Sequence, residues 1–170
     1  VYKRQVYLLG KVPSPKILLK AFEEVKPNLI LTVPLILEKI YKKMILPQLS
    51  KTTMKVALNI PLLDSRIYAQ IRKKLVDAFG GRFREVIVGG AAMNEEVTNF
   101  LYKIKFPFTI GYGMTECGPL ISYDHNDEYV PGSCGQILKG IMKVRIDSED
   151  PYNKVGEIQV SGENAVSYTH

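Results

Sequence analysis

Two glycine-rich turns carry the residues whose types and spacing are best suited to chemistry. Gly89 begins the first turn and Gly111 the second. Glycine and alanine let a ligand approach the backbone closely, so that N–H and C=O groups can bind a flat polar ring such as adenine. In the second turn Tyr112 offers a stacking face, Thr115 a hydroxyl for a phosphate oxygen, and Glu116 a carboxylate for Mg²⁺. Together these groups fit a nucleoside triphosphate and its metal.

Each of these features alone also has an ordinary structural explanation. A Gly-Gly-Ala-Ala stretch is a tight turn in most proteins, Tyr112 can be a packing residue, and a Thr-Glu pair commonly starts a helix because threonine is a good cap. Their joint spacing favours a site. Residues 85–116 have the pattern of strand, helix and strand, so the two strands should be parallel and both turns should lie at one edge of the sheet. Ligands bind at that edge in open α/β sheets.

The elements that must position these turns follow from hydrophobic periodicity and from capping residues. We expect a strand at 6–9, a helix capped by Ser14, a strand at 29–33, a helix from Pro34, a helix capped by Asp64-Ser65 and ended by Gly80-Gly81, a strand at 85–88, a helix capped by Asn94, and strands at 108–110, 141–146 and 157–160. This order predicts an α/β fold, in which a largely parallel sheet flanked by helices is followed by a small β-rich subdomain. We place the α/β core at 6–123 and the start of the β subdomain at 124–165.

Composition places the chain among globular proteins. It has 170 residues, of which 46% are hydrophobic and 24% charged, with a net charge of +6. The basic residues are spread out rather than grouped with aromatics, which disfavours nucleic-acid binding and leaves attraction to phosphates or a membrane surface open.

Cys117 and Cys134 have no metal-ligand spacing and are predicted to be reduced thiols. No apolar run approaches the ~20 residues of a membrane span and no signal peptide is visible, so we expect a cytoplasmic protein. Peripheral membrane association and the oligomeric state are left open by the sequence.

The two terminal pentapeptides have a sequence relationship of their own. Residues 1–5 can be encoded by GTGTATAAGAGACAG. The reverse complement of that string, extended by AT and read from its third base, encodes residues 166–170. This element looks like a transposon end used in preparing sequencing libraries. Our hypothesis is that the native chain runs from about Val6 to Ala165.

The second turn also resembles a family signature. Residues 111–116 resemble the signature of the adenylate-forming synthetases, which include acyl-CoA synthetases, luciferases and peptide-synthetase adenylation domains. Residues 88–93 resemble the adenine-binding turn of that family, at the expected distance upstream. Further resemblances lie at 26–28, 32–34, 38–39, 131–135, 155–158 and 161–164, so that nearly all of residues 6–165 is covered. The chain as a whole is similar to the bacterial long-chain fatty acid–CoA ligases and would form part of the large N-terminal domain of the adenylate-forming fold.

The resemblance implies a site and a reaction. Its nucleotide-binding residues would be Gly89, Gly90, Ala91, Ala92, Gly111, Tyr112, Gly113, Met114 and Thr115. Thr115 and Glu116 would be catalytic, with Glu116 also the Mg²⁺ ligand. A fatty acid would attack the α-phosphate of ATP to give an acyl-adenylate, and coenzyme A would then displace AMP. The phosphate loop, the ribose-binding aspartate and the catalytic lysine of the family are absent from this sequence, so we expect the chain alone to be inactive.

Two alternative functions remain open from the sequence. The chain can belong to an adenylation domain that loads a carrier protein, or to an inactive nucleotide-binding or interaction module. Residues 117–121, which are small or apolar, would suit the lining of an acyl pocket. Residues 124–128 include a histidine and three carboxylates, but no second ligand cluster accompanies them, so a solvated loop is favoured over a metal site.

Overall fold

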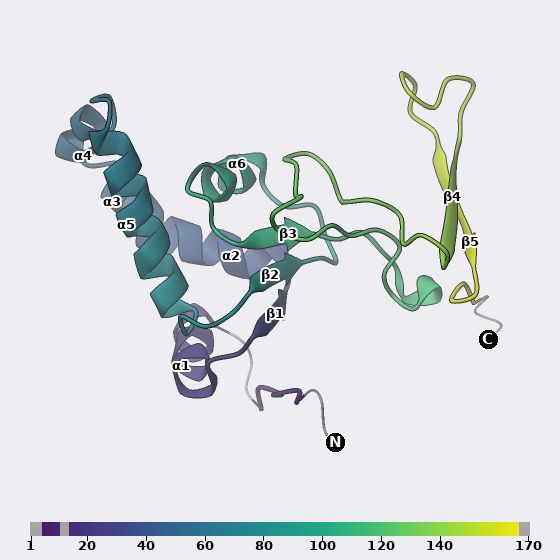
Figure 1. The fold of residues 1–170 in the computed structure, drawn as a ribbon, viewed down its shortest axis with the longest axis horizontal. Coiled ribbons are helices and arrows are strands. Elements are labelled where there is room, and N and C mark those ends of the chain that lie inside the picture. The colour runs from purple at the N-terminus through teal and green to yellow at the C-terminus, as the bar shows by residue number, and fades with distance from the viewer. Residues whose placement is uncertain (1–4, 11–13, 167–170) are drawn as a thin grey trace.

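A three-stranded parallel sheet lies at the centre of the structure. The computed structural model describes residues 5–10 and 14–166. Strands β1 (Leu29–Thr32), β2 (Glu85–Val88) and β3 (Phe108–Ile110) lie in the order β1-β2-β3 (Figure 1). Both strand pairs are parallel, with Ile30 opposite Val86 and Val86 opposite Phe108. The predicted parallel sheet is therefore confirmed.

Four of the described helices pack on one face of this sheet. They are α1 (Pro15–Val25), α2 (Pro34–Ile40), α5 (Leu63–Ala78) and α6 (Glu95–Lys103). Side chains alternate between the two faces of a strand, and the residues that meet the helices belong to one set. The shared core contains Ile30, Ile40, Leu75, Phe79, Val86, Val88, Leu101 and Phe108. On the opposite face Leu31 is 73% exposed, so helices do not flank both faces within the described residues.

Helix boundaries follow the predicted caps at two of three sites. The Ser14 hydroxyl accepts from Ile17 N at 3.4 Å, and Asn94 Oδ1 accepts from Val97 N at 3.2 Å. The cap predicted for α5 is wrong, because Leu63 N already donates to Ile60 O and starts the helix earlier. Asp64 accepts from the adjacent Ser65 N instead of capping. The predicted end is confirmed by Gly80, whose φ of 92° suits glycine.

A helical extension follows α2. A π-helical turn (Tyr41–Ile45), α3 (Leu46–Leu49) and α4 (Thr52–Ala57) lead back to α5. The helix from Pro34 was expected, but α4 was not. In the π turn Leu46 N donates to Tyr41 O, five residues back. This change of register immediately precedes Pro47, which lacks the N–H needed to continue a regular helix.

The predicted strand at 6–9 does not form. Residues 5–9 have no strand pairing, and Val6 and Leu8 are 82% and 83% exposed. An isolated strand is not stable without a neighbour to satisfy its backbone. Within the described residues no such neighbour reaches this segment.

A β-hairpin ends the described chain. Strands β4 (Met142–Asp147) and β5 (Glu157–Gly162) pair antiparallel and stand apart from the central sheet (Figure 1). Met142 joins Cys117 and Ile121 in a second, smaller core. The β-rich segment is confirmed. The domain boundary at 123/124 and the non-native ends stay predictions, and residues 1–4 and 167–170 lie outside the described part.

Candidate active site

The two glycine-rich turns meet at one edge of the sheet. Gly89 directly follows β2 and Gly111 directly follows β3, and these strands are parallel neighbours. Gly89 N donates to Thr32 O at 3.1 Å, and Gly111 N donates to Val88 O at 2.9 Å. A Cβ added to Gly89 would lie 3.6 Å from Gly111 O. The predicted juxtaposition of the turns is therefore present in the fold.

The first turn presents its backbone to solvent. Gly90 has a φ of 88°, which side-chain-bearing residues rarely adopt, and Gly90, Ala91 and Ala92 are exposed. The far end of the turn is fixed to α2, because Asn94 N donates to Glu38 Oε1 at 3.0 Å. A planar ligand can thus reach a backbone that is held in place at both ends.

The second turn folds back on the chain that follows it. Tyr112 N donates to Ser122 O at 3.1 Å, and Ser122 N donates to Tyr112 O at 3.0 Å. A Cβ on Gly113 would overlap the carbonyl oxygen of Pro119. Glycine is required here for close packing of the backbone, which the sequence had suggested only for a ligand. The half-buried Tyr112 packs on the small core beside Ile121.

Thr115 and Glu116 lie on the surface at the end of the second turn. They begin a short 3₁₀ helix (Thr115–Cys117) in which only Cys117 is buried. Glu116 forms no salt bridge with any residue that the structure describes. An exposed carboxylate beside a hydroxyl is a donor set that suits Mg²⁺ shared with phosphate oxygens, and the first turn leaves its backbone exposed for a nucleotide. The residues present therefore fit the predicted metal and nucleotide.

A cleft of about 340 Å³ opens beside Glu116. Its lining comprises Met114, Glu116, Cys117, Ile158, Val160, Ala165 and Val166. Of the stretch predicted to line an acyl pocket, Cys117 faces this cleft, whereas Ile121 is buried in the small core. Cys134 is exposed, and both cysteines are free thiols.

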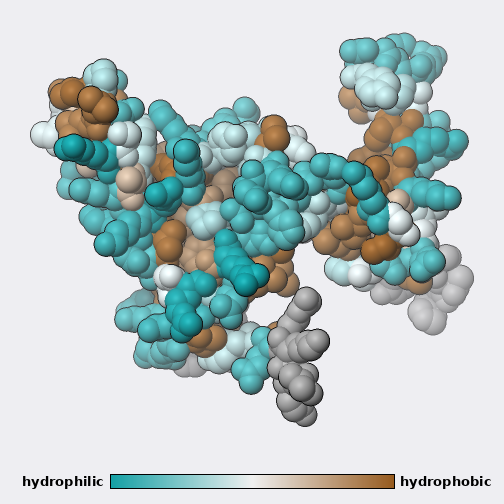
Figure 2. Space-filling view, viewed as in Figure 1, coloured by the Kyte–Doolittle hydropathy of each residue, from teal (hydrophilic) through white to brown (hydrophobic). Residues whose placement is uncertain are grey.

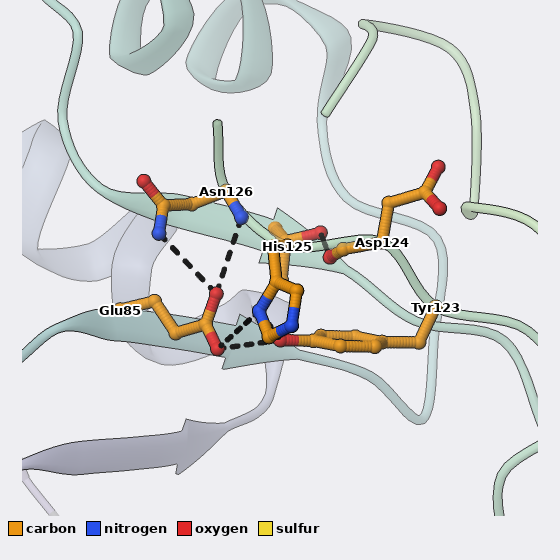
Figure 3. Close-up of polar contacts among 6 residues, drawn as sticks. Glu85, Tyr123, Asp124, His125 and Asn126 are labelled. Carbon is orange, nitrogen blue, oxygen red and sulfur yellow. Dashed lines mark hydrogen bonds and ion pairs between the residues drawn. The ribbon is translucent and has the colours of Figure 1, made fainter. Parts of the chain in front are cut away.

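A buried carboxylate holds the chain that follows the second turn (Figure 3). Glu85 begins β2 and is only 6% exposed. Its Oε1 accepts from the Tyr123 hydroxyl and lies 3.5 Å from His125 Nδ1. Its Oε2 accepts from the backbone N and side-chain Nδ2 of Asn126, at 3.1 and 3.3 Å. Beside this cluster, Thr109 Oγ1 donates to the carbonyl oxygen of Asp124 at 2.8 Å.

Electrostatics in this cluster favour the ionised carboxylate. Burial alone would raise the pKa of Glu85, but hydrogen bonds from Tyr123 and Asn126 and the nearby charge of His125 hold that pKa below its ordinary value. Burial and the contact with Glu85 raise the pKa of Tyr123, so the phenol stays protonated and donates.

The predicted loop at 124–128 is present and its side chains are partly solvated, but these contacts hold part of it against the sheet. The first half of that segment is tied to β2 and β3, whereas Asp127 and Glu128 are exposed. In the described part of the chain no three His, Cys, Asp or Glu residues are grouped to hold a metal ion. Glu85 was missed as a structural residue. The available signal was a carboxylate at the start of an otherwise apolar, buried strand.

The family assignment follows from comparison with known proteins. A profile described as AMP-binding enzyme matches residues 4–168, almost the entire chain. The chain belongs to this family of adenylate-forming enzymes, and the resemblance noted in the sequence is confirmed.

Similar proteins include several CoA ligases. Long-chain-fatty-acid–CoA ligase 1 of Saccharomyces cerevisiae is 24% identical over 159 residues, which cover 84% of this chain and 23% of that protein. 4-Coumarate–CoA ligase 1 of Narcissus pseudonarcissus is 30% identical over 115 residues, which cover 60% of this chain and 21% of that protein. The chain thus spans less than a quarter of the length of these two relatives.

Solved structures confirm the fold class. O-succinylbenzoate CoA synthetase of Bacillus subtilis, in complex with ATP and a magnesium ion, superposes with a TM-score of 0.56 at 18% identity, covering 90% of this chain and 26% of that one. A long-chain-fatty-acid–CoA ligase from Archaeoglobus fulgidus gives a TM-score of 0.56 at 15% identity, covering 89% and 28%.

Proposed function

We propose that the complete protein carrying this chain is an ATP-dependent fatty acyl-CoA ligase. Its reaction would join a carboxylate to the α-phosphate of ATP, release pyrophosphate, and pass the acyl group to the thiol of coenzyme A. The observation that carries the proposal is the meeting of the two turns at one sheet edge, with Thr115 and Glu116 exposed at the end of the second turn.

Each group of the site has a role in this proposal. The backbone of Gly89–Ala92 and the ring of Tyr112 hold adenine, and Thr115 donates its hydroxyl to a phosphate oxygen. Glu116 holds Mg²⁺, which when bound neutralises charge on the phosphates. The work of these residues is to position the reactants and to stabilise developing charge.

The acyl substrate is the finer part of the proposal. Similarity to yeast long-chain-fatty-acid–CoA ligases and the apolar lining beside Glu116 support an alkyl carboxylate. The 4-coumarate–CoA ligases among the similar proteins make an aromatic acid the alternative to test. Comparing palmitate with 4-coumarate in the same assay separates the two classes.

Loss of the Glu116 carboxylate tests the site. We expect Glu116→Ala in the complete protein to lower acid-dependent pyrophosphate exchange by about two orders of magnitude or more, because a group that stabilises transition-state charge is lost. Glu128→Ala is the matched control, since Glu128 is also exposed but lies outside the two turns. An exchange rate unchanged by Glu116→Ala would remove the proposed role. Exchange without CoA-ester formation would favour loading of a carrier protein instead.

A further inference from the structure

The helical extension between α2 and α5 concentrates the positive charge of the chain. We call residues 39–74 the basic arm. Its cations are Lys39, Lys42, Lys43, Lys51, Lys55, Arg66, Arg72, Lys73 and Lys74. Asp64 is its only carboxylate. Nine cations and one carboxylate give the arm a larger positive charge than the +6 of the whole chain, so the rest of the chain is net negative. No arm cation forms a salt bridge with a residue that the structure describes.

The free end of the basic arm is apolar and uncovered. Val56, Ile60, Leu62 and Leu63 are 59%, 48%, 81% and 38% exposed. Neither α3 nor α4 contains a buried residue. Figure 2 shows a hydrophobic patch at this end of the molecule, at the upper left, with hydrophilic surface around it. The tip of the arm therefore exposes aliphatic side chains that contribute little to the packing of the described chain.

Leu62 adds a backbone observation to this patch. Its φ of 70° lies in the left-handed region, which is strained for a branched side chain. A leucine held there while 81% exposed gains little from packing in return. Because packing within the described chain does not offset this backbone strain, we take it to indicate that Leu62 makes a contact outside the described chain.

We propose that the basic arm docks on an anionic lipid surface, with its apolar tip in the interfacial region. Aliphatic side chains bordered by lysine and arginine are the chemistry of such docking: the apolar groups enter the headgroup boundary while the cations attract anionic lipid. A nucleic acid or an acidic protein would use the cations but would gain less from the exposed tip. No described helix has both the length and the apolar character to span a bilayer.

Vesicle co-sedimentation of the complete protein tests this docking. We expect binding to phosphatidylcholine vesicles that contain phosphatidylglycerol, and weaker binding to phosphatidylcholine alone or at high salt. Leu62→Asn should weaken binding by about tenfold, because an apolar contact is lost. Asparagine tolerates the left-handed conformation, so thermal stability should be unchanged or higher. Lys51→Glu combined with Lys55→Glu should weaken binding by about tenfold or more.

A matched control and three outcomes decide the proposal. Val155→Asn removes a fully exposed aliphatic group from the distant β-hairpin and should leave vesicle binding unchanged. Equal binding to neutral and anionic vesicles would overturn the proposal. So would vesicle binding that Leu62→Asn leaves intact, or lysine variants that weaken only retention on DNA. Pyrophosphate exchange is measured separately, so failure of docking and failure of the proposed reaction are distinguishable.

Discussion

At the scale of single residues, Gly113 is where the second turn has no room for a side chain. A Cβ would overlap the carbonyl oxygen of Pro119, and neither backbone can yield without moving the turn. We expect Gly113→Ala to lower the free energy of unfolding by about 2 kcal/mol or more. Gly111→Ala is the control, since its Cβ would lie 3.1 Å from the mobile end of Leu120. Denaturant unfolding should show the larger loss for Gly113→Ala, and equal losses would contradict this account.

Glu85 makes the stability of the fold depend on pH. Its pKa in the folded state is below the ordinary value of 4.5, so its contribution is fully present above about pH 4.5 and is lost as the pH falls through the lower folded-state pKa. In Glu85→Gln the amide oxygen can still accept from Tyr123. The amide nitrogen would then face the two nitrogens of Asn126, which are also donors, and these hydrogen bonds would be lost. We expect the substitution to cost about 1–3 kcal/mol at about pH 7, and less at acid pH.

The matched control for Glu85 is an exposed carboxylate. Glu157→Gln changes the same chemical group on β5, where the side chain is exposed, and it should not alter the pH profile of unfolding. The free energy of unfolding is measured between about pH 3 and pH 7 for Glu85→Gln and for the parent chain. If the two curves run parallel, the Glu85 carboxylate is not the cause of the acid sensitivity.

At the scale of elements, local signals predicted what local forces determine. The stripe of α6 and the Asn94 cap lie within a few residues of each other, and both were found from the sequence. The wrong cap at Asp64 is a local failure, since Leu63 N already donates to Ile60 O, whereas two other failures depend on packing. A strand at 6–9 needs a neighbour, and α4 contains no buried residue from which periodicity could be recognised.

The candidate site shows the same division. The two turns were predictable because each directly follows a strand, and parallel pairing then places them together. The bracing of residues 122–126 by Glu85 was not predictable, since its contacts join positions about 40 residues apart. The role of Glu116 is predicted from its place in a motif, whereas the contacts of Glu85 come from the structure alone.

At the scale of the whole molecule, the central sheet is covered unevenly. Helices cover one face, and residues 122–126 cover Glu85 and Thr109 on the other. Leu29 and Leu31 of β1 remain 49% and 73% exposed on that second face. In the part of the chain that the structure describes, β1 pairs with β2 alone. An apolar edge strand of this kind is a surface for association with another chain.

Self-association of the 170-residue chain at this face is therefore expected. Leu31→Lys should weaken it by about tenfold, because one leucine is no longer buried in the contact and a charge is placed at the edge strand. Unfolding stability should change little, since Leu31 is already largely exposed. Sedimentation velocity over a concentration series measures the effect, with Val155→Lys as an equally charged change on the hairpin. If both variants shift association equally, net charge is responsible; if only Leu31→Lys does, the uncovered strand is where the chains meet.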